Sequence, residues 1–172
     1  MRHARWALVV ITLISAATQA TAQNWKEHRP DGGGYVVEMP GEPKVTWQDV
    51  PTKIGDIKTY IAVLDNGTIA FVTMYSRYPE NYSASADSIL EAGRNGAVAN
   101  VKGKLRAETN VTINSFPGRE IMIDAPGERV MILRYFLRGN TLIQAITGGT
   151  AGVETNADAR RFLDSLRSTA DK

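Results

Sequence analysis

The sequence predicts an α+β domain, namely an α/β/α sandwich with a central, mostly antiparallel sheet and two main helices. Segments of strand composition follow one another through turns that are too short for helical crossovers, so neighbouring strands must run antiparallel. Residues 85–101 and 156–168 have apolar side chains at helical spacing. Residues 129–138 are apolar on both faces, which is typical of a strand in a sheet that is covered on each side.

Residues 1–22 have the pattern of a secretory signal peptide. Arg2, His3 and Arg5 form a basic start, and an apolar run from Trp6 to Ala17 follows it. The sequence Ala20-Thr21-Ala22 has the small residues of a cleavage site. The apolar run is shorter than the roughly 20 residues that a membrane span needs, so we expect cleavage, with an uncleaved N-terminal anchor as the alternative.

After the signal peptide we expect an N-terminal arm at residues 23–34 and a single domain at residues 35–172. The chain contains no cysteine, which excludes disulfides and a lipid-modified cysteine at the cleavage site. These features predict a periplasmic or secreted bacterial protein with no stable membrane insertion after signal cleavage.

The charge of the chain excludes one class of partner. The whole sequence has 20 basic and 18 acidic residues, and the signal peptide holds Arg2 and Arg5. The mature chain therefore has 18 of each sign and is neutral. Because it has no excess of basic residues, it lacks the electrostatic footprint of a nucleic-acid-binding protein, and we expect no nucleic acid among its partners.

The first half of the predicted sheet contains two short strands and a hairpin. The short strands are residues 35–39 and 45–50, each followed by a proline. The hairpin joins residues 57–64 to residues 68–78 through Asn66-Gly67, the strongest short turn signal in the chain. A two-residue loop there would place Tyr60 opposite Thr73.

The predicted helix at 85–101 begins at Ser85, a good N-terminal cap. Gly93 and Gly96 each weaken a helix by about 1 kcal/mol relative to alanine. Either the helix stops near Asn95, or Gly93 lets it lie close to the sheet, and we prefer the second interpretation. Residues 105–114 then return as a strand.

The last predicted elements are a three-stranded meander and a helix. A two-residue turn at Pro126-Gly127 would place Asp124 opposite Arg129 and put Ile121 on the same face as Ile132. A second turn, at residues 139–140, leads into the strand that ends at residues 148–149. The final helix spans 156–168, with Thr155 and Asp158 in the spacing of a capping box.

Four segments of the chain resemble a known group. They read YVVxMPGxP at 35–43, FPGRE at 116–120, RxFLxGNxLxQ at 134–144 and FLDSL at 162–166. This pattern is similar to exported bacterial domains of unknown function with the PsbP/Mog1-like fold. The resemblance implies an α/β/α sandwich with a central antiparallel sheet and supplies no catalytic residues. PsbP-like members assist photosystem assembly or oxygen evolution, and Mog1 binds a small GTPase; neither role is transferred to this chain.

The sequence offers no catalytic or metal-binding constellation. His28 is the one histidine beyond the signal peptide, and no cysteine or nucleophile-elbow motif could act with it. Nitrogen and sulfur ligands for zinc are nearly absent. We therefore expect no catalytic residues, no metal and no cofactor, and we predict that the protein is not an enzyme.

The candidate binding residues are Tyr75, Tyr78 and Tyr82, which cluster in sequence before the first helix. Exposed tyrosines at a strand end can bind a small ligand or a protein surface, and packing at the edge of the core is the alternative. The first hypothesis is a non-enzymatic binding or accessory domain of the bacterial cell envelope, with an unknown protein or small ligand as its partner.

Two other functions remain open at this point. Glu120 and Asp124 share a strand face near Arg129 and Arg134, which predicts cross-strand ion pairs. A carboxylate-based hydrolase without histidine would need a cleft that holds two such carboxylates. A structural subunit of an envelope assembly would need a large exposed apolar patch.

Overall fold

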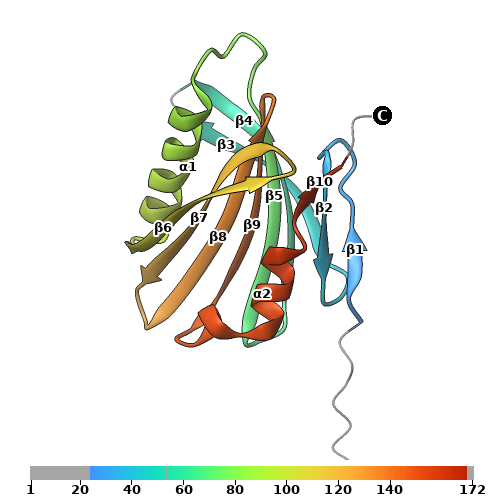
Figure 1. Ribbon diagram of the computed structural model, residues 1–172, viewed down its shortest axis with the longest axis vertical. Helices are drawn as coiled ribbons and strands as arrows, with labels where there is room; N and C mark the ends of the chain where they lie inside the picture. The colour runs from blue at the N-terminus through green and yellow to red at the C-terminus, as the bar shows by residue number, and fades with distance from the viewer. Residues whose placement is uncertain (1–23, 53, 170–172) are drawn as a thin grey trace, which may run out of the picture.

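The computed structural model describes residues 24–52 and 54–169. The predicted signal peptide and its cleavage site lie outside these residues. The centre of the fold is a seven-stranded sheet in the order β3-β4-β5-β9-β8-β7-β6, in which every neighbouring pair is antiparallel (Figure 1). Its strands are β3 (Lys44–Thr52), β4 (Gly55–Asp65), β5 (Ile69–Arg77), β6 (Lys104–Ile113), β7 (Phe116–Ala125), β8 (Arg129–Arg138) and β9 (Thr141–Thr150).

The two faces of this sheet are covered differently. Helix α1 (Ala86–Asn100) lies on one face, as Figure 1 shows. The other face carries helix α2 (Ala157–Asp164), the short 3-10 helix η1 (Val153–Thr155) and a three-stranded sheet in the order β1-β2-β10. The small sheet consists of β1 (Lys26–His28), β2 (Tyr35–Met39) and β10 (Arg167–Ser168). The α+β prediction is confirmed, but strands dominate, and one outer layer is not purely helical.

The larger core lies between the sheet and α2. Phe162 of α2 is fully buried and meets Phe71 of β5 edge-on, with 5.4 Å between the ring centroids. Trp25 packs against the same core, and its ring lies 6.1 Å from Phe71 and 4.4 Å from the guanidinium carbon of Arg161. Trp25 therefore covers one edge of this core.

The smaller core lies under α1. Ile89 and Leu90 of the helix are buried against Ile121, Leu133 and Tyr135 of the sheet. Full burial of one aliphatic side chain stabilises a protein by about 1.5–3 kcal/mol, so these few contacts hold α1 with less apolar area than the other core provides. The two cores contain no residue in common.

Helix α1 is confirmed, with Ser85 as its cap: the Ser85 side chain accepts a hydrogen bond from the backbone N–H of Ser88. The helix continues through both glycines to Asn100. The predicted last helix is shorter than expected. Its cap is Asn156 rather than Thr155, because the Asn156 side chain accepts hydrogen bonds from two backbone N–H groups.

Two predicted hairpin registers are wrong. Tyr60 lies opposite Tyr75 rather than Thr73, because the Asn66 side chain bonds the backbone N–H groups of residues 68 and 69 and lengthens the loop. This shift leaves the side chains on their predicted faces. In the other hairpin the loop is one residue longer, so Ile121 lies opposite Leu133 and on the opposite face from Ile132.

Two segments near the ends of the chain form strands that pair with β2, although the sequence predicted a helix end for one and an arm for the other. Residues 167–168, predicted as helix, form β10 against Tyr35 and Val36 of β2. Residues 26–28, predicted as part of an arm, form β1 against the other side of β2. Within the described residues, no helix has the length and apolar character required to cross a membrane.

Candidate functional site

Helix α1 leaves part of its sheet face uncovered. Along β5 the residues alternate between fully buried and half-buried. The buried ones, such as Phe71, face the α2 core, and the half-buried ones, such as Met74 and Ser76, lie beside α1. The helix packs mainly over β7 and β8, so the surface of β4, β5 and β9 next to it remains open.

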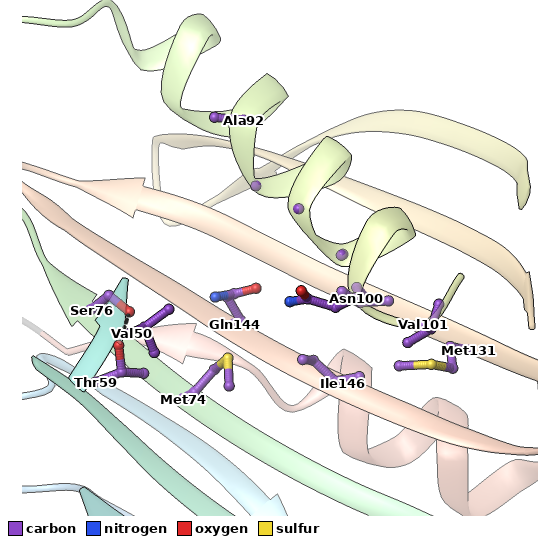
Figure 2. Close-up of a pocket in the computed structure, with 14 residues that line it drawn as sticks. Val50, Thr59, Met74, Ser76, Ala92, Asn100, Val101, Met131, Gln144 and Ile146 are labelled. Carbon is purple, nitrogen blue, oxygen red and sulfur yellow. Dashed lines mark hydrogen bonds between the residues drawn. The ribbon is translucent and has the colours of Figure 1, made fainter. Parts of the chain in front are cut away.

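This open surface contains two adjoining hollows. The first has a volume of about 260 Å³ and lies between α1 and strands β3, β4, β5, β8 and β9 (Figure 2). The second has a volume of about 470 Å³ and lies between α1 and the residues at the β3–β4 turn. Ala92, Gly93 and Gly96 line both hollows. We call the two hollows together the α1 groove.

The part of the α1 groove lining that the structure describes is largely apolar. None of its described lining residues is an aspartate, glutamate, lysine, arginine or histidine. Its apolar walls include Val50, Ile54, Ile89, Met131 and Ile146. Pockets of this size with apolar walls and a few polar groups are typical of small-molecule sites.

Two side-chain amides lie in the middle of the first hollow. Gln144 reaches up from β9, and Asn100 reaches across from the end of α1, so that their amide groups face one another in Figure 2. Neither amide hydrogen-bonds to another residue in the part of the chain that the structure describes. The nearby hydroxyls of Thr59 and Ser76 instead satisfy each other, at 2.8 Å. The first hollow therefore holds two amides without a described protein partner, of which Gln144 is half-buried and Asn100 is exposed.

The glycines of α1 are not required by the packing of the chain itself. A methyl group added at Gly93 would lie 3.6 Å from a ring carbon of Tyr135, which is an ordinary contact. One added at Gly96 would meet nothing within 4 Å. The helix continues past Asn95, so the alternative in which it stops there is wrong. The packing at Gly93 would also accept an alanine, and both glycines line the groove.

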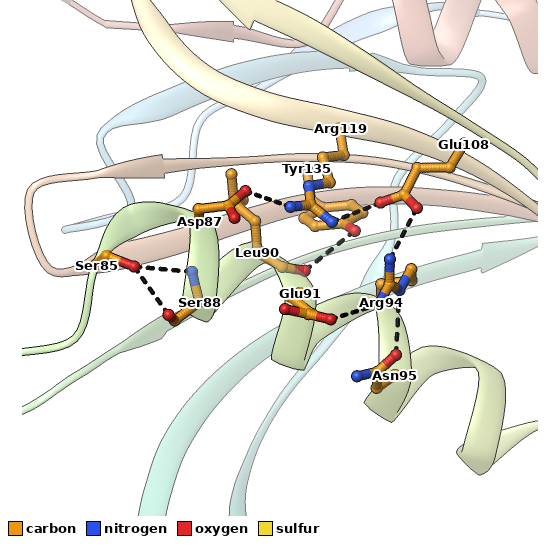
Figure 3. Close-up of polar contacts among 10 residues, drawn as sticks. All are labelled: Ser85, Asp87, Ser88, Leu90, Glu91, Arg94, Asn95, Glu108, Arg119 and Tyr135. Atoms are coloured by element: carbon orange, nitrogen blue, oxygen red, sulfur yellow. Dashed lines mark hydrogen bonds and ion pairs between the residues drawn. The ribbon is translucent and has the colours of Figure 1, made fainter.

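The opposite side of α1 is fixed by ion pairs (Figure 3). Arg119 of β7, which is only 8% exposed, donates to Asp87 of the helix and to Glu108 of β6, the latter at 2.6 Å. Arg94 of the helix donates to the other oxygen of Glu108 at 2.9 Å. Burial disfavours the charge on Glu108, but the two arginines outweigh it and keep its pKa below the ordinary value. These contacts anchor the helix on the side away from the groove.

The structure separates the three predicted tyrosines. Tyr78 and Tyr82 stack with ring centroids 5.3 Å apart, and both line the second hollow. Burial raises the pKa of Tyr78. Tyr75 lies on the other face of β5, where it stacks on Tyr60 at 5.2 Å and its hydroxyl donates to the backbone oxygen of Asp31 at 2.7 Å.

Tyr75 is therefore a core residue and not part of the same surface as Tyr78 and Tyr82. It is 5% exposed. Alternate residues of a strand point to opposite faces, so a cluster that spans the strand end is divided between the two sides. A binding role for Tyr78 and Tyr82 stays a prediction.

The carboxylates of β7 form ion pairs outside the groove. Glu120 accepts from Arg134 at 2.8 Å and from Arg160 at 2.9 Å, which confirms the predicted pair with Arg134. Asp124 pairs with Arg106 rather than with Arg129, because the register is shifted. The hydrolase alternative therefore gains no support from the groove.

The structure also gives the position of His28. The Nε2 atom of His28 lies 2.9 Å from the Tyr60 hydroxyl, at the edge of the larger core. Burial lowers the pKa of His28. Within residues 24–52 and 54–169, no three histidine, aspartate or glutamate side chains lie close enough together to hold a metal ion.

Gln144 and Asn100 were missed as site residues by sequence reasoning. In the sequence, Gln144 belongs to the fold pattern RxFLxGNxLxQ at 134–144. The available signal was a polar side chain within the apolar run Leu142–Ala145, but such a residue can also face solvent.

Comparisons with known proteins give a fold and no family. No family model and no curated protein matches the chain. The solution structure of cyanobacterial PsbP (CyanoP) from Synechocystis sp. PCC 6803 is similar, with a TM-score of 0.56, 11% identity, and coverage of 91% of this chain and 98% of that chain. A Pseudomonas aeruginosa protein of unknown function, described as a putative regulator, aligns with a TM-score of 0.38 and 13% identity over 76% of this chain and 87% of that chain. The chain thus has a PsbP-like fold.

Proposed function

We propose that the protein is a non-enzymatic binding or accessory domain of the bacterial cell envelope, and that it holds a largely apolar ligand in the α1 groove. The observation that carries this proposal is the groove itself, an open surface with a largely apolar described lining, beside a helix that is fixed on its other side. Displacing water from such a surface favours binding of an apolar ligand.

The envelope location rests on the sequence at the N-terminus. A basic start, an apolar run and a small-residue cleavage sequence are the parts of a secretory signal. The intact mass of the protein isolated from its own cells tests this location. A mature chain that begins at Gln23 supports export, and a full-length chain in the cytoplasm contradicts it.

A structural role is the second candidate, and strand β3 is the feature that favours it. This strand forms one edge of the sheet, and all nine of its residues are exposed. Val45 and Trp47 are 47% and 48% exposed on it. An unpaired edge with apolar side chains can pair with another chain. Pro51, which has no N–H to donate, limits such pairing.

The groove is tested by filling it. Gly96→Leu places a side chain where a Cβ has open space, so the variant should fold while blocking the groove. Ala99→Leu adds a similar bulk at an exposed position of the same helix that does not line either hollow. Wild type and both variants are purified gently from the native envelope and compared by native mass spectrometry.

We expect an extra ligand mass on the wild type and on Ala99→Leu, and its loss on Gly96→Leu. Thermal unfolding should show that Gly96→Leu is at least as stable as the wild type, because a helix glycine is removed. A ligand mass that persists on Gly96→Leu would contradict the groove as the site, as would three proteins that carry no ligand.

A further inference from the structure

We propose that strand β3 pairs antiparallel with β3 of a second copy of this chain, around a two-fold axis that passes through Trp47. The proposal deepens the second candidate function by naming the partner of the β3 edge, and it does not depend on ligand binding in the α1 groove. It rests on the exposed apolar side chains of β3, on the contrast between the two edges of the sheet, and on the positions of two prolines.

Exposed apolar side chains gather on β3. The part of the chain that the structure describes exposes six large apolar side chains, and three of them lie on this strand, namely Val45 at 47%, Trp47 at 48% and Val50 at 37%. Tyr60 and Tyr75 hold the ring of Trp47 by edge-on contacts, with 5.4 and 5.7 Å between the ring centroids. An exposed aromatic ring that is already held in position is typical of an interface anchor, since it loses little conformational entropy on binding.

The two edges of the seven-stranded sheet are protected to different degrees. Edge strand β6 contains three charged residues, and its pairing with β7 has a register shift between Leu105 and Ala107. Charged residues and bulges of this kind discourage pairing with another chain. Edge strand β3 pairs residue for residue with β4, and beyond its first residue it contains one charged residue, Asp49. The β3 edge is therefore the one that can accept a further strand.

The prolines define how much of β3 can pair. Successive residues of a strand direct their N–H and C=O groups alternately toward one neighbour and toward the other. Pro51 has no N–H, and proline within an edge strand is found where the N–H would face away from the sheet. Val45, Trp47 and Asp49 share its orientation, so their N–H and C=O groups face outward. Pro43 precedes the strand and ends this row of donors on the other side.

The row of outward donors is symmetric about Trp47, because Pro43 and Pro51 each lie four residues from it. Antiparallel pairing at this centre places Trp47 opposite Trp47 of the second copy, and Val45 opposite Asp49 of the second copy. The three outward N–H groups of each copy then meet three C=O groups of the other, and each proline faces a proline. Any other centre would place a proline opposite one of the three donors, so this register pairs the strand most completely.

The side chains are compatible with this register. The two Trp47 rings lie next to each other, and Val45 of each copy lies diagonal to Trp47 of the other, within reach of an aromatic side chain. Lys44 of one copy lies opposite Val50 of the other and therefore beside Asp49, which has the opposite charge. The mature chain has equal numbers of basic and acidic residues, so net charge does not keep two copies apart.

The pairing brings two α1 grooves together. A two-fold axis perpendicular to the sheet exchanges the copies without exchanging the faces, so both α1 helices lie on the same face of the joined sheet. Val50 belongs to the paired segment and also lines the groove. The dimer therefore presents its two grooves on either side of the shared edge.

Three variants test the pairing. Val45→Glu places a charge of the same sign opposite Asp49 of the second copy, whereas Val45→Lys places the opposite charge there. Leu105→Glu is the matched control, because Leu105 is 41% exposed on the other edge strand, β6. Sedimentation velocity of the mature protein and the variants over a wide range of concentrations measures the dissociation constant of the dimer. Thermal unfolding shows that each variant is folded.

We expect the wild type and Leu105→Glu to form dimers with the same dissociation constant. Val45→Glu should raise this constant about tenfold, because it creates two like-charge pairs in each dimer. Val45→Lys should stay within about threefold of the wild type, since two opposite-charge pairs offset the lost apolar contact.

Introduced cysteines test the register, because the chain has no cysteine of its own. Opposite residues that exchange hydrogen bonds have Cα atoms about 5.5 Å apart, which a disulfide can span. Trp47→Cys should therefore form a covalent dimer under mild oxidation, seen on a non-reducing gel. A mixture of Thr46→Cys and Gln48→Cys, which this register places opposite each other, should also cross-link and leaves Trp47 in place. Thr46→Cys alone should react much more slowly.

A wild type that stays monomeric at every concentration would overturn the proposal, as would a dimer that Val45→Glu and Leu105→Glu weaken equally. The register is wrong if neither Trp47→Cys nor the mixed pair cross-links. A monomeric chain that binds a different protein, and loses it on Val45→Glu, would assign the β3 edge to that protein instead. None of these results affects the ligand mass expected to be lost on Gly96→Leu, so the α1 groove is tested separately.

Discussion

At the scale of single residues, Tyr75 and Tyr82 should respond very differently to substitution. Tyr75 is 5% exposed and packs within the larger core, whereas Tyr82 is 37% exposed and stacks on Tyr78. Tyr75→Ala should lower the free energy of unfolding by about 3–5 kcal/mol, and Tyr82→Ala by less than about 1 kcal/mol. Urea denaturation measures both. Equal losses would show that the two tyrosines are not on different faces of the fold.

The ion pairs of Glu120 predict a pH dependence. Burial opposes its charge, but hydrogen bonds from Arg160 and Arg134 prevail and lower its pKa below the ordinary value of 4.5. A carboxyl group with a lowered pKa stabilises the folded state above about pH 4.5, and this stabilisation is lost as the pH falls through the lowered pKa.

Glu120→Gln should therefore destabilise the protein at pH 7 by about 2 kcal/mol, the scale of hydrogen bonds to charged groups. The difference from wild type should shrink below about pH 4.5, where the wild-type carboxyl takes up its proton. Urea denaturation across this pH range measures it. Glu80→Gln, at an exposed loop position, is the matched control. A difference that stays constant with pH would show that the charge of Glu120 is not its cause.

The residues of the site were predictable only in part. Tyr78 and Tyr82 could be chosen from their positions at a strand end, and they do line the groove. Gln144 and Asn100 could not, because the role of an amide depends on what lies opposite it. That environment arises when β9 pairs with β5, a strand about 70 residues away in sequence, and no local pattern encodes this pairing.

At the scale of elements, the two glycines of α1 should be replaceable at a gain in stability. Gly93→Ala and Gly96→Ala should each raise the free energy of unfolding by about 0.5–1 kcal/mol, since both sites have room for a methyl group. Gly118→Ala should do the reverse, because its Cβ would lie 2.4 Å from the backbone oxygen of Tyr135. Thermal unfolding of the three variants measures this contrast. A loss of stability at Gly96 would contradict the open space beside α1.

The elements themselves were largely predictable, and their registers were less so. Periodicity and the Ser85 cap defined α1 closely. The hairpin loops were longer than the two-residue turns expected, because the Asn66 side chain forms its own turn and Glu128 adopts a positive φ of 56°. Residues 167–168 join a strand through contacts with β2, which no local propensity reveals.

At the scale of the whole molecule, the predicted α+β class and antiparallel sheet hold, but the order of the strands did not follow from the sequence. Turn signals could define the sequential pairs β4–β5, β7–β8 and β8–β9. They could not show that β5 joins β9 and thereby places β3 and β6 at the edges. That order creates the α1 groove, because α1 lies toward the β6 edge and leaves the β3 side open.

Removal of the signal peptide predicts a change in the charge of the whole molecule. The full chain has a sequence pI of about 8.9, whereas loss of Arg2 and Arg5 leaves equal numbers of basic and acidic residues. Isoelectric focusing of the protein from its own cells should therefore give a band near neutral pH. The full-length recombinant chain, focused beside it, should remain near the higher value. Identical positions would contradict the predicted cleavage.

The separation of the two cores by the sheet has a consequence for the evolution of the protein. The larger core under α2 and the smaller core under α1 share no residue. A substitution in the groove therefore does not disturb the packing of the larger core. Lineages that diverge from a common ancestor could then change the groove lining for new compounds while the opposite face keeps the chain folded. Sequence drift should accordingly be fastest along the exposed side of α1 and slowest around Phe162.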